Sequence, residues 1–157
     1  MRTGAGAAAV GTVLAVDGLV HLYWATGRTW PASDTARLSQ LVLNLQVPFT
    51  PQVLVPLAGV LLSGAALVLA HGGRLPALAR RLPPVLPRLA TGVVAGGLLA
   101  RGAVGLVWAT GAGADPGDTF YWLNLLLYTP LCLVLGRTAW RLSAAPAPAP
   151  APAPAAQ

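Results

Sequence analysis

The sequence predicts an all-α membrane protein with four transmembrane helices arranged as two parallel helix-pair repeats. Of the 157 residues, 55% are hydrophobic and only 9% are charged, whereas about a quarter of the residues in a typical soluble domain are charged. Four apolar stretches each reach the roughly 20 residues that a helix needs to cross the hydrocarbon core. An internal repeat groups these stretches in pairs.

The four predicted spans cover about residues 4–25, 51–70, 89–111 and 119–139. Backbone groups in lipid must be hydrogen-bonded within their own segment, so all four spans are expected to be helices. Pro56 in the second span and Pro130 in the fourth predict kinks. Residues 1–143 form the predicted transmembrane domain, and residues 144–157, an Ala-Pro repeat, are expected to be an extended, disordered tail.

The arginines orient the predicted spans. One side has seven of them, which are Arg2, Arg74, Arg80, Arg81, Arg88, Arg137 and Arg141. The other side has only Arg28 and Arg37, and the last loop there has two aspartates and no base. Because basic loops stay in the cytoplasm, both termini are expected to be cytoplasmic.

A cleaved signal peptide is the alternative interpretation of the N-terminus. The apolar stretch there contains Asp17 and His21, and no small-residue cleavage site follows it. Both features argue against cleavage.

Aromatic residues mark the outer ends of the spans, where such rings favour the headgroup level. They are Tyr23, Trp24, Trp30, Phe49, Trp108, Phe120, Tyr121 and Trp122. Residues 33–46 predict a short helix on this outer surface, capped by Ser33 or Asp34. Its apolar stripe is expected to hold Leu38, Leu41, Val42 and Leu45. On the inner side, residues 75–89 are expected to contact anionic headgroups.

Several classes of function are excluded. The arginines flank or interrupt apolar stretches and form no basic face, so the sequence pI of 11.1 does not indicate nucleic-acid binding. A single cysteine excludes a disulfide framework and a thiolate metal site. Phosphate loops, nucleophile elbows and HExxH or paired-carboxylate patterns are absent from the sequence. We expect no metal and no cofactor.

The internal repeat is the most informative pattern. Residues 18–27 read GLVHLYWATG and residues 102–111 read GAVGLVWATG, with seven of ten positions identical at an offset of 84. Slightly smaller offsets pair Asn44 with Asn124 and Thr50-Pro51 with Thr129-Pro130. We interpret this as two helix pairs related by an axis along the membrane normal. Coincidence in an Ala/Gly/Leu/Val-rich chain is the alternative.

The repeat places Asp17 opposite Arg101. Each lies near the middle of a span, where an isolated charge costs roughly 3 kcal/mol on insertion scales. We therefore predict an ion pair between the two residues across the repeats. Such a pair would serve either structure or function. Small residues on the first and third spans are expected to let the helices approach closely. They are Gly11, Ala15, Gly18, Gly92, Gly96 and Gly97.

Helical spacing gathers further polar and aromatic residues around this pair. The predicted ligand-pocket residues are Asp17, His21, Trp24, Arg101, Trp108, Tyr121, Asn124 and Tyr128. They converge on a polar pocket in the outer leaflet, roofed by aromatic rings. Each residue also has a structural interpretation: a buried ion pair, an interhelical hydrogen bond, or an interfacial anchor.

Two segments resemble a small bacterial four-span membrane family that is catalogued only as a domain of unknown function. The first runs from His21 to Trp30 and fits H-x-Y-W-x-x-G-x-x-W, and the second runs from Tyr128 to Leu133 and fits Y-x-P-x-C-L. The resemblance covers about residues 5–140 and includes Arg101-Gly102. It implies a four-helix protein of the bacterial plasma membrane and supplies no activity. The family pattern often has Asp where this chain has Asn124.

Three functions compete. The first is binding of a small apolar or lipid-like molecule, with an enzyme acting on it as an extension in which His21 serves as acid or base. The second is a structural or accessory subunit that contacts itself or another membrane protein. Transport is the third, and it is least favoured because the inner halves of the spans have few polar residues. Membrane lipids are the expected surroundings in every case.

Overall fold

The computed structural model describes residues 2–145, and within that range the chain is all-helical, with no strand. Four segments of this range are long and apolar enough to cross a membrane. They are α1 (Arg2–Ala25), α3 (Pro51–His71), α5 (Val85–Ala109) and a last segment that joins α6 (Thr119–Leu123), the π-helical turn η1 (Asn124–Tyr128) and α7 (Thr129–Ala144). The prediction of a four-helix, multi-pass membrane protein is confirmed.

Two helix boundaries differ from the sequence prediction by four or five residues. α5 begins at Val85 instead of Leu89, because Pro84 before it has a φ of −57° that already suits a helix start. α7 continues past Ala139 to Ala144, since its last arginines lower the hydropathy but keep good helix propensity. The connection between α3 and α5 contains one short helix, α4 (Pro76–Ala79). Residues 146–157 of the predicted tail lie outside the described residues.

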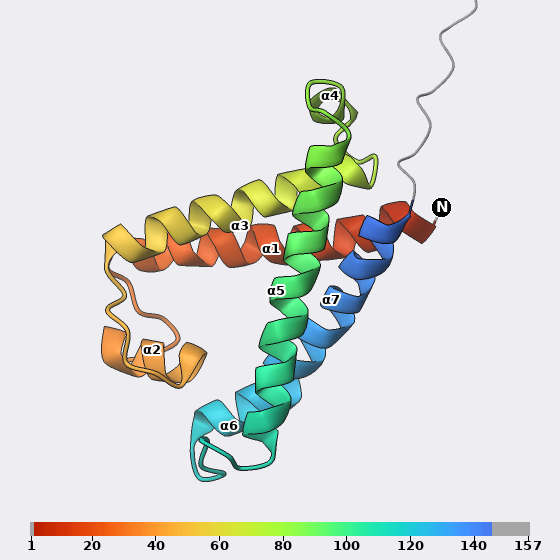
Figure 1. Cartoon of the computed structure of the whole chain (residues 1–157). Coiled ribbons are helices and arrows are strands. Elements are labelled where there is room, and N and C mark those ends of the chain that lie inside the picture. Colours follow the sequence, from red (N-terminus) through yellow and green to blue (C-terminus); the bar gives the residue numbers. More distant parts are fainter. Residues whose placement is uncertain (1, 146–157) are drawn as a thin grey trace, which may run out of the picture.

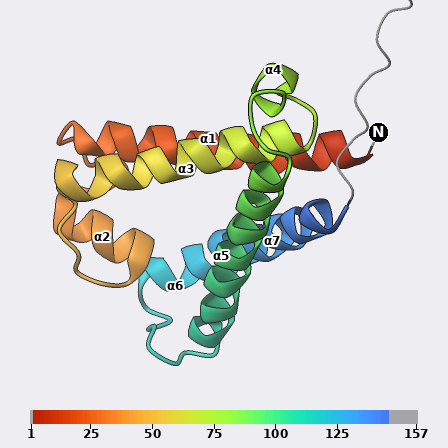
Figure 2. The ribbon, with the colours of Figure 1, turned by 45° about the horizontal axis from the view of Figure 1, so that its top comes forward.

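The spanning helices form two antiparallel hairpins, α1 with α3 and α5 with α7 (Figures 1 and 2). The hairpins contact each other where α3 meets α5 and where α1 meets α7. From there they diverge (Figure 1). We call the end that holds the start of α1 and the end of α7 the closed end. The opposite end, where α2 and α6 lie, is the open end.

Small side chains hold the closed end together. One alanine of each spanning helix is buried there: Ala7, Ala65, Ala95 and Ala139, none more than 3% exposed. Lipid tails are as apolar as the helix surfaces, so the hydrophobic effect does not drive helices together in a membrane. Helix association depends instead on close packing, which small residues permit. A hydrogen bond of 2.9 Å between His71 Nε2 and the Leu142 carbonyl joins the two hairpins at the same end.

Glycines set the helix spacing within each hairpin. Gly18 makes room for Leu62, and Gly102 makes room for Leu133; an added Cβ would lie 2.8 Å and 2.6 Å from these side chains. The two glycines are equivalent in the predicted repeat. Both hairpins therefore pack in the same way: a leucine of one helix fills the space over a glycine of the other.

Two of the glycines expected at a helix contact do not lie at one. No heavy atom comes within 4 Å of a Cβ built on Gly96 or Gly97, and Gly92 only approaches Ser143 at 3.9 Å. The prediction of close approach is wrong for Gly96 and Gly97, which are exposed. An apolar helix has no polar face to show which side turns toward its neighbours.

α2 (Thr35–Leu43) is the predicted surface helix, and it covers the open end (Figure 1). Asp34, one of the two expected caps, accepts a hydrogen bond of 2.8 Å from the Arg37 backbone N–H. Leu38 is 1% exposed and packs with Trp24 and Phe49. The helix is therefore fixed to the first hairpin by its apolar side.

The predicted stripe of α2 is too long by one residue. The helix ends at Leu43, and Asn44 takes a left-handed conformation with a φ of 57°. Leu45 is consequently 60% exposed and lies off the apolar face. The side chain of Asn44 instead donates a 2.7 Å hydrogen bond to the Gly113 carbonyl, which connects α2 to the second hairpin.

The first helix of each hairpin ends in the same way. Gly27 and Gly111 both have a φ of +87°, and each donates its N–H to the carbonyl of a tryptophan at 3.0 Å. Thr26 and Thr110 each donate a 2.7 Å hydrogen bond to the carbonyl three residues earlier. The recurring Trp-Ala-Thr-Gly thus has a conformation in common. The repeat as a whole stays a prediction from the sequence.

The glycine packing predicts a stability difference. A Cβ on Gly136 would lie 3.0 Å from the Leu99 backbone nitrogen, so Gly136→Ala should separate α5 from α7 and cost about 1–3 kcal/mol. Gly97→Ala, the matched control, should leave stability unchanged or raise it by up to about 1 kcal/mol. Thermal unfolding in detergent measures both. Equal melting temperatures for the two variants would contradict the packing described.

The cap of α2 predicts a pH dependence. The Arg37 backbone N–H, followed by the Ser33 hydroxyl, holds the pKa of Asp34 below its ordinary value. A carboxyl with a lowered pKa stabilises the folded state above its unfolded pKa and loses this effect as the pH falls through the folded value. Hydrogen-exchange protection of α2 should therefore fall below about pH 4. In Asp34→Ala it should be low already at neutral pH, and a pH-independent protection in the wild type would contradict the cap.

Candidate functional site

Asp17 and Arg101 lie at the same distance along their helices from the open end. Asp17 lies eight residues before the end of α1 at Ala25, and Arg101 lies eight residues before the end of α5 at Ala109. At about 1.5 Å per residue, each is about 12 Å from the open end. Both charges therefore lie inside their spanning helices.

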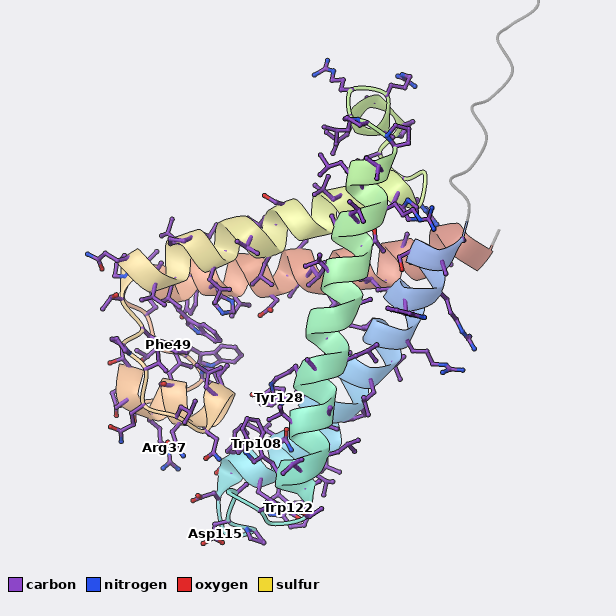
Figure 3. The ribbon with its side chains drawn as sticks, in the orientation of Figure 1. Arg37, Phe49, Trp108, Asp115, Trp122 and Tyr128 are labelled. Atoms are coloured by element: carbon purple, nitrogen blue, oxygen red, sulfur yellow. The ribbon has the colours of Figure 1, made fainter. Side chains whose placement is uncertain are left out.

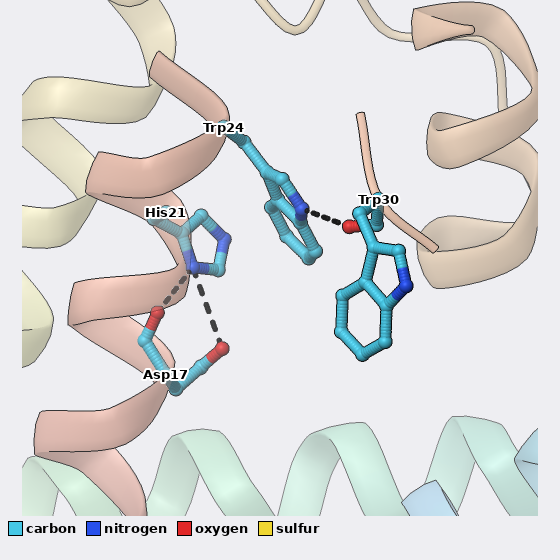
Figure 4. Close-up of polar contacts among 4 residues, drawn as sticks. All are labelled: Asp17, His21, Trp24 and Trp30. Carbon is cyan, nitrogen blue, oxygen red and sulfur yellow. Dashed lines mark hydrogen bonds and ion pairs between the residues drawn. The ribbon is translucent and has the colours of Figure 1, made fainter. Parts of the chain in front are cut away.

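On the first hairpin, Asp17, His21 and Trp24 form one row along α1 (Figure 4). His21 Nδ1 lies 2.8 Å from the Asp17 backbone carbonyl and 3.4 Å from the Asp17 carboxylate. A carbonyl oxygen only accepts hydrogen bonds, so this contact assigns the ring hydrogen to Nδ1. The His21 ring meets Trp24 edge-on, with centroids 5.1 Å apart. The Trp24 indole N–H in turn donates to the Trp30 carbonyl at 2.9 Å.

The two members of this row differ in exposure. The side chain of His21 is 9% exposed, whereas that of Asp17 is 49% exposed. The Asp17 carboxylate points to the side on which α5 passes (Figure 4). A half-exposed carboxylate thus lies on the inner side of a spanning helix.

On the second hairpin, Arg101 lies among neutral groups. Its Nη1 donates a 3.3 Å hydrogen bond to Asn124 Oδ1. The guanidinium carbon lies 4.9 Å from the centroid of the Trp108 ring and 5.7 Å from that of Tyr128. Both rings lie on the side of α5 that faces α2 (Figure 3). Cation–π contacts with these rings stabilise the guanidinium where water is scarce.

Asn124 joins the helices of the second hairpin. It is fully buried, and its amide donates a 2.9 Å hydrogen bond to the Gly105 carbonyl on α5. Its Oδ1 accepts from Arg101 and also from the Thr129 hydroxyl, at 3.1 Å. A Cβ on Gly105 would lie 2.0 Å from that hydroxyl oxygen, so glycine is required for this contact.

The chain forms a wide helical turn at this point for a local reason. Pro130 has no N–H and its ring crowds the carbonyl four residues earlier, so the regular α-helical pattern cannot continue through it. The Thr129 N–H bonds the Asn124 carbonyl instead, five residues back, and residues 124–128 form the π-helical turn η1. Such turns often occur at functional sites. The predicted irregularity at Pro130 is therefore this turn.

The predicted ion pair between Asp17 and Arg101 is wrong for this structure. Among residues 2–145, the basic side chain found within 4 Å of Asp17 is His21, and no guanidinium nitrogen of Arg101 lies within 4 Å of a carboxylate. The hairpins diverge before they reach this depth (Figure 1). Each charge is instead contacted by its own hairpin: Asp17 by the next turn of α1, and Arg101 by Asn124.

Tyr128 lies beside Arg101 and also contacts α2. The Arg101 guanidinium carbon is 5.7 Å from the centroid of its ring. Its hydroxyl donates a 3.4 Å hydrogen bond to the Leu41 carbonyl of α2. The two rows therefore lie on the sides that the hairpins turn toward each other (Figures 3 and 4). We call Asp17, His21, Arg101, Asn124 and Tyr128 the polar cluster.

One predicted pocket residue and part of the aromatic belt lie elsewhere. Tyr121 donates a 3.1 Å hydrogen bond to the Ala109 carbonyl, at the open end of the second hairpin. Phe120 is 2% exposed, and Phe49 is 9% exposed. These two phenylalanines pack against Trp108 and Trp24 inside the protein, whereas Trp30 and Trp122 stay exposed as a belt requires.

Thr129 and Gly105 belong to the Asn124 network but are not among the predicted pocket residues. A signal was present, because Thr129-Pro130 matches Thr50-Pro51 in the repeat. The role of Thr129 depends on a π-helical turn that brings its hydroxyl to Asn124, and spacing on a regular helix does not show this.

A separate cavity of about 370 Å³ lies nearer the closed end, between α5 and α7. Leu99, Leu133, Arg137 and Trp140 line it. None of the predicted pocket residues belongs to this lining. No group of three metal-ligating side chains is present among residues 2–145.

Comparison with known proteins gives a family. Residues 14–139 match the model of a family described as "Protein of unknown function (DUF3995)". The match includes every member of the polar cluster. No curated protein and no solved structure matches the chain.

The network around Asn124 predicts the effect of its loss. Asn124→Leu should leave the Gly105 carbonyl and the Arg101 guanidinium without a partner at a buried position, which costs about 1–3 kcal/mol for each unsatisfied group. Asn124→Asp keeps the oxygen that accepts from Arg101 and should be less destabilising. Thermal unfolding in detergent compares the two variants, and an Asn124→Leu protein as stable as the wild type would disprove this role.

Proposed function

The chain belongs to the family described as "Protein of unknown function (DUF3995)", and from the geometry of the polar cluster we propose that it binds a lipid-like molecule between its two hairpins. The polar end of that molecule lies at the polar cluster. Its apolar part lies along the diverging helices, next to Trp108 and Tyr128. The proposal concerns binding, and no reaction is assigned.

One observation carries this proposal. Asp17 and Arg101 lie at the same distance from the open ends of their helices, the Asp17 carboxylate points to the side on which α5 passes (Figure 4), and no contact within 4 Å joins the two charges. Each unpaired charge inside a membrane costs roughly 3 kcal/mol, so such residues generally face a partner or a cavity. A bound molecule with a polar end supplies that partner.

The surroundings support a partly apolar ligand. Leu19 and Val16, beside Asp17 on α1, are 58% and 53% exposed. Leu126 and Leu127, beside Tyr128, are 71% and 49% exposed. Apolar side chains at this depth contact hydrocarbon, either of the bilayer or of a ligand.

The proposal includes an orientation. The closed end carries the arginines of the α3–α5 connection, so it faces the cytoplasm of a bacterial cell by the positive-inside rule. The polar cluster then lies in the outer half of the plasma membrane, about 12 Å from the outer ends of α1 and α5. A ligand would enter from the outer leaflet.

The alternative function is a structural or accessory subunit. It is favoured by the Asn124 network, in which every hydrogen bond found stays within the second hairpin. In that case the exposed charge of Asp17 would contact another protein span. The two functions differ in what the purified protein retains.

Native mass spectrometry of the gently purified protein tests the proposal. The wild type should retain a discrete small molecule, and His21→Ala and Arg101→Gln should lower the bound fraction about tenfold, because Arg101→Gln removes a charged contact and His21→Ala removes the ring that contacts Asp17. His71→Ala and Arg137→Gln are matched controls, because both residues lie outside the polar cluster and near the closed end.

The controls separate binding from folding. If His71→Ala loses the molecule as fully as His21→Ala does, the loss reflects stability. A wild type with no discrete molecule, or with the same bulk lipid as His21→Ala, would contradict the proposal. A retained protein partner would then support the accessory subunit.

A further inference from the structure

We propose that the polar end of the ligand is a zwitterion, with a phosphate on Arg101 and a primary ammonium on Asp17, as in an ethanolamine phospholipid. This inference rests on the proposed function and names its ligand class. It comes from the two opposite charges and from what each already contacts.

The Arg101 guanidinium can donate further hydrogen bonds. A guanidinium has five N–H donors, and among the described residues one hydrogen bond uses them, from Nη1 to Asn124 Oδ1. The rings of Trp108 and Tyr128 contact the guanidinium through their faces. The planar fork of an arginine matches two oxygens of a phosphate. Arg101 is therefore the group that would bind an anionic part.

The Asp17 carboxylate can accept further hydrogen bonds. Its contact with His21 is long, at 3.4 Å, and the hydrogen on His21 Nδ1 is already shared with the Asp17 backbone carbonyl at 2.8 Å. The carboxylate is half exposed, so a donor can reach it. A primary ammonium has three N–H donors, as in lysine, and satisfies a carboxylate directly.

The same contacts disfavour two other headgroups. A choline group has no N–H donor, and it is usually bound by the faces of aromatic rings. Here Arg101 already contacts the faces of Trp108 and Tyr128. An anionic glycerol headgroup would satisfy Arg101 but leave a carboxylate beside it with no cation, and like charges at close range are unfavourable.

The directions of the charged side chains support a single headgroup that reaches both charges. The Asp17 carboxylate points to the side on which α5, the helix of Arg101, passes (Figure 4), and the Arg101 guanidinium lies beside Tyr128, 5.7 Å from its ring centroid. Phosphate and ammonium are two carbons apart in an ethanolamine headgroup. One small zwitterion can therefore neutralise both charges without adding net charge to the membrane interior.

A direct ion pair is the competing explanation. If the hairpins closed, Asp17 and Arg101 would neutralise each other and no headgroup would be needed. Reversal of both charges, Asp17→Arg with Arg101→Asp, then restores folded yield relative to each single reversal. Under our inference the double reversal restores neither the yield nor the ethanolamine preference.

Lipid competition tests the inference. The delipidated protein in detergent is given equal amounts of phosphatidylethanolamine, phosphatidylglycerol and phosphatidylcholine with the same acyl chains, and bound lipid is counted by native mass spectrometry. The wild type should bind the ethanolamine lipid about tenfold more than either other lipid. Asp17→Asn should lose this preference and bind phosphatidylglycerol at least as well as phosphatidylethanolamine. Arg101→Gln should lose binding of all three lipids.

Matched variants keep the result interpretable. Asp118→Asn and Arg137→Gln remove the same charges outside the polar cluster and should keep the wild-type preference. Asp17→Glu retains the carboxylate and should also keep it. Elution as a single species in size-exclusion chromatography checks that each variant is folded.

The outcomes separate the two proposals. If the wild type binds a lipid that Arg101→Gln loses, but Asp17→Asn leaves the preference unchanged, the zwitterion inference is overturned and the proposed function stands. If the wild type binds the three lipids equally, the inference is likewise overturned. If it binds none of them, and retains no other molecule, the proposed function itself is overturned.

Discussion

The structure depends on one constraint, which is that helices in hydrocarbon must be held together by packing. At the closed end this is achieved by four buried alanines, one from each spanning helix, which let all four backbones approach. At the open end of the described chain, residues 2–145, the hairpins are joined through α2, by its contact with α6 and by single hydrogen bonds that involve Asn44 and Tyr128. The fold is therefore tight at one end and divergent at the other.

The divergence explains why the charges are available. Within the second hairpin, Asn124, Thr129 and the Gly105 carbonyl satisfy one another in a buried network, and Arg101 is attached to that network through Asn124. Within the first hairpin, His21 uses its ring hydrogen on the backbone of α1. Each hairpin thus satisfies its own neutral polar groups. The two full charges are what the hairpins leave unneutralised, and they lie on the sides that the hairpins turn toward each other.

There is a physical reason why each hairpin satisfies its neutral polar groups but not its charge. A neutral amide or hydroxyl is satisfied by one or two hydrogen bonds at short range, which a single hairpin supplies. A full charge in low dielectric needs an opposite charge as well. Only the other hairpin or a ligand can supply that opposite charge. The hairpins diverge before they reach these residues (Figure 1), and the ligand that we propose carries both charges.

The sequence by itself determined the class of protein, the number of spans, the pairing of helices and which residue types lie at membrane depth, because hydropathy and helical spacing are local properties. It also placed Arg101, Trp108, Asn124 and Tyr128 near each other, since they share faces of neighbouring helices. Only the tertiary structure decided that Asp17 does not pair with Arg101, that Gly96 and Gly97 face outward, and that Thr129 belongs to the Asn124 network. These features depend on the angle between hairpins and on a π-helical turn, and residue spacing on a regular helix contains neither.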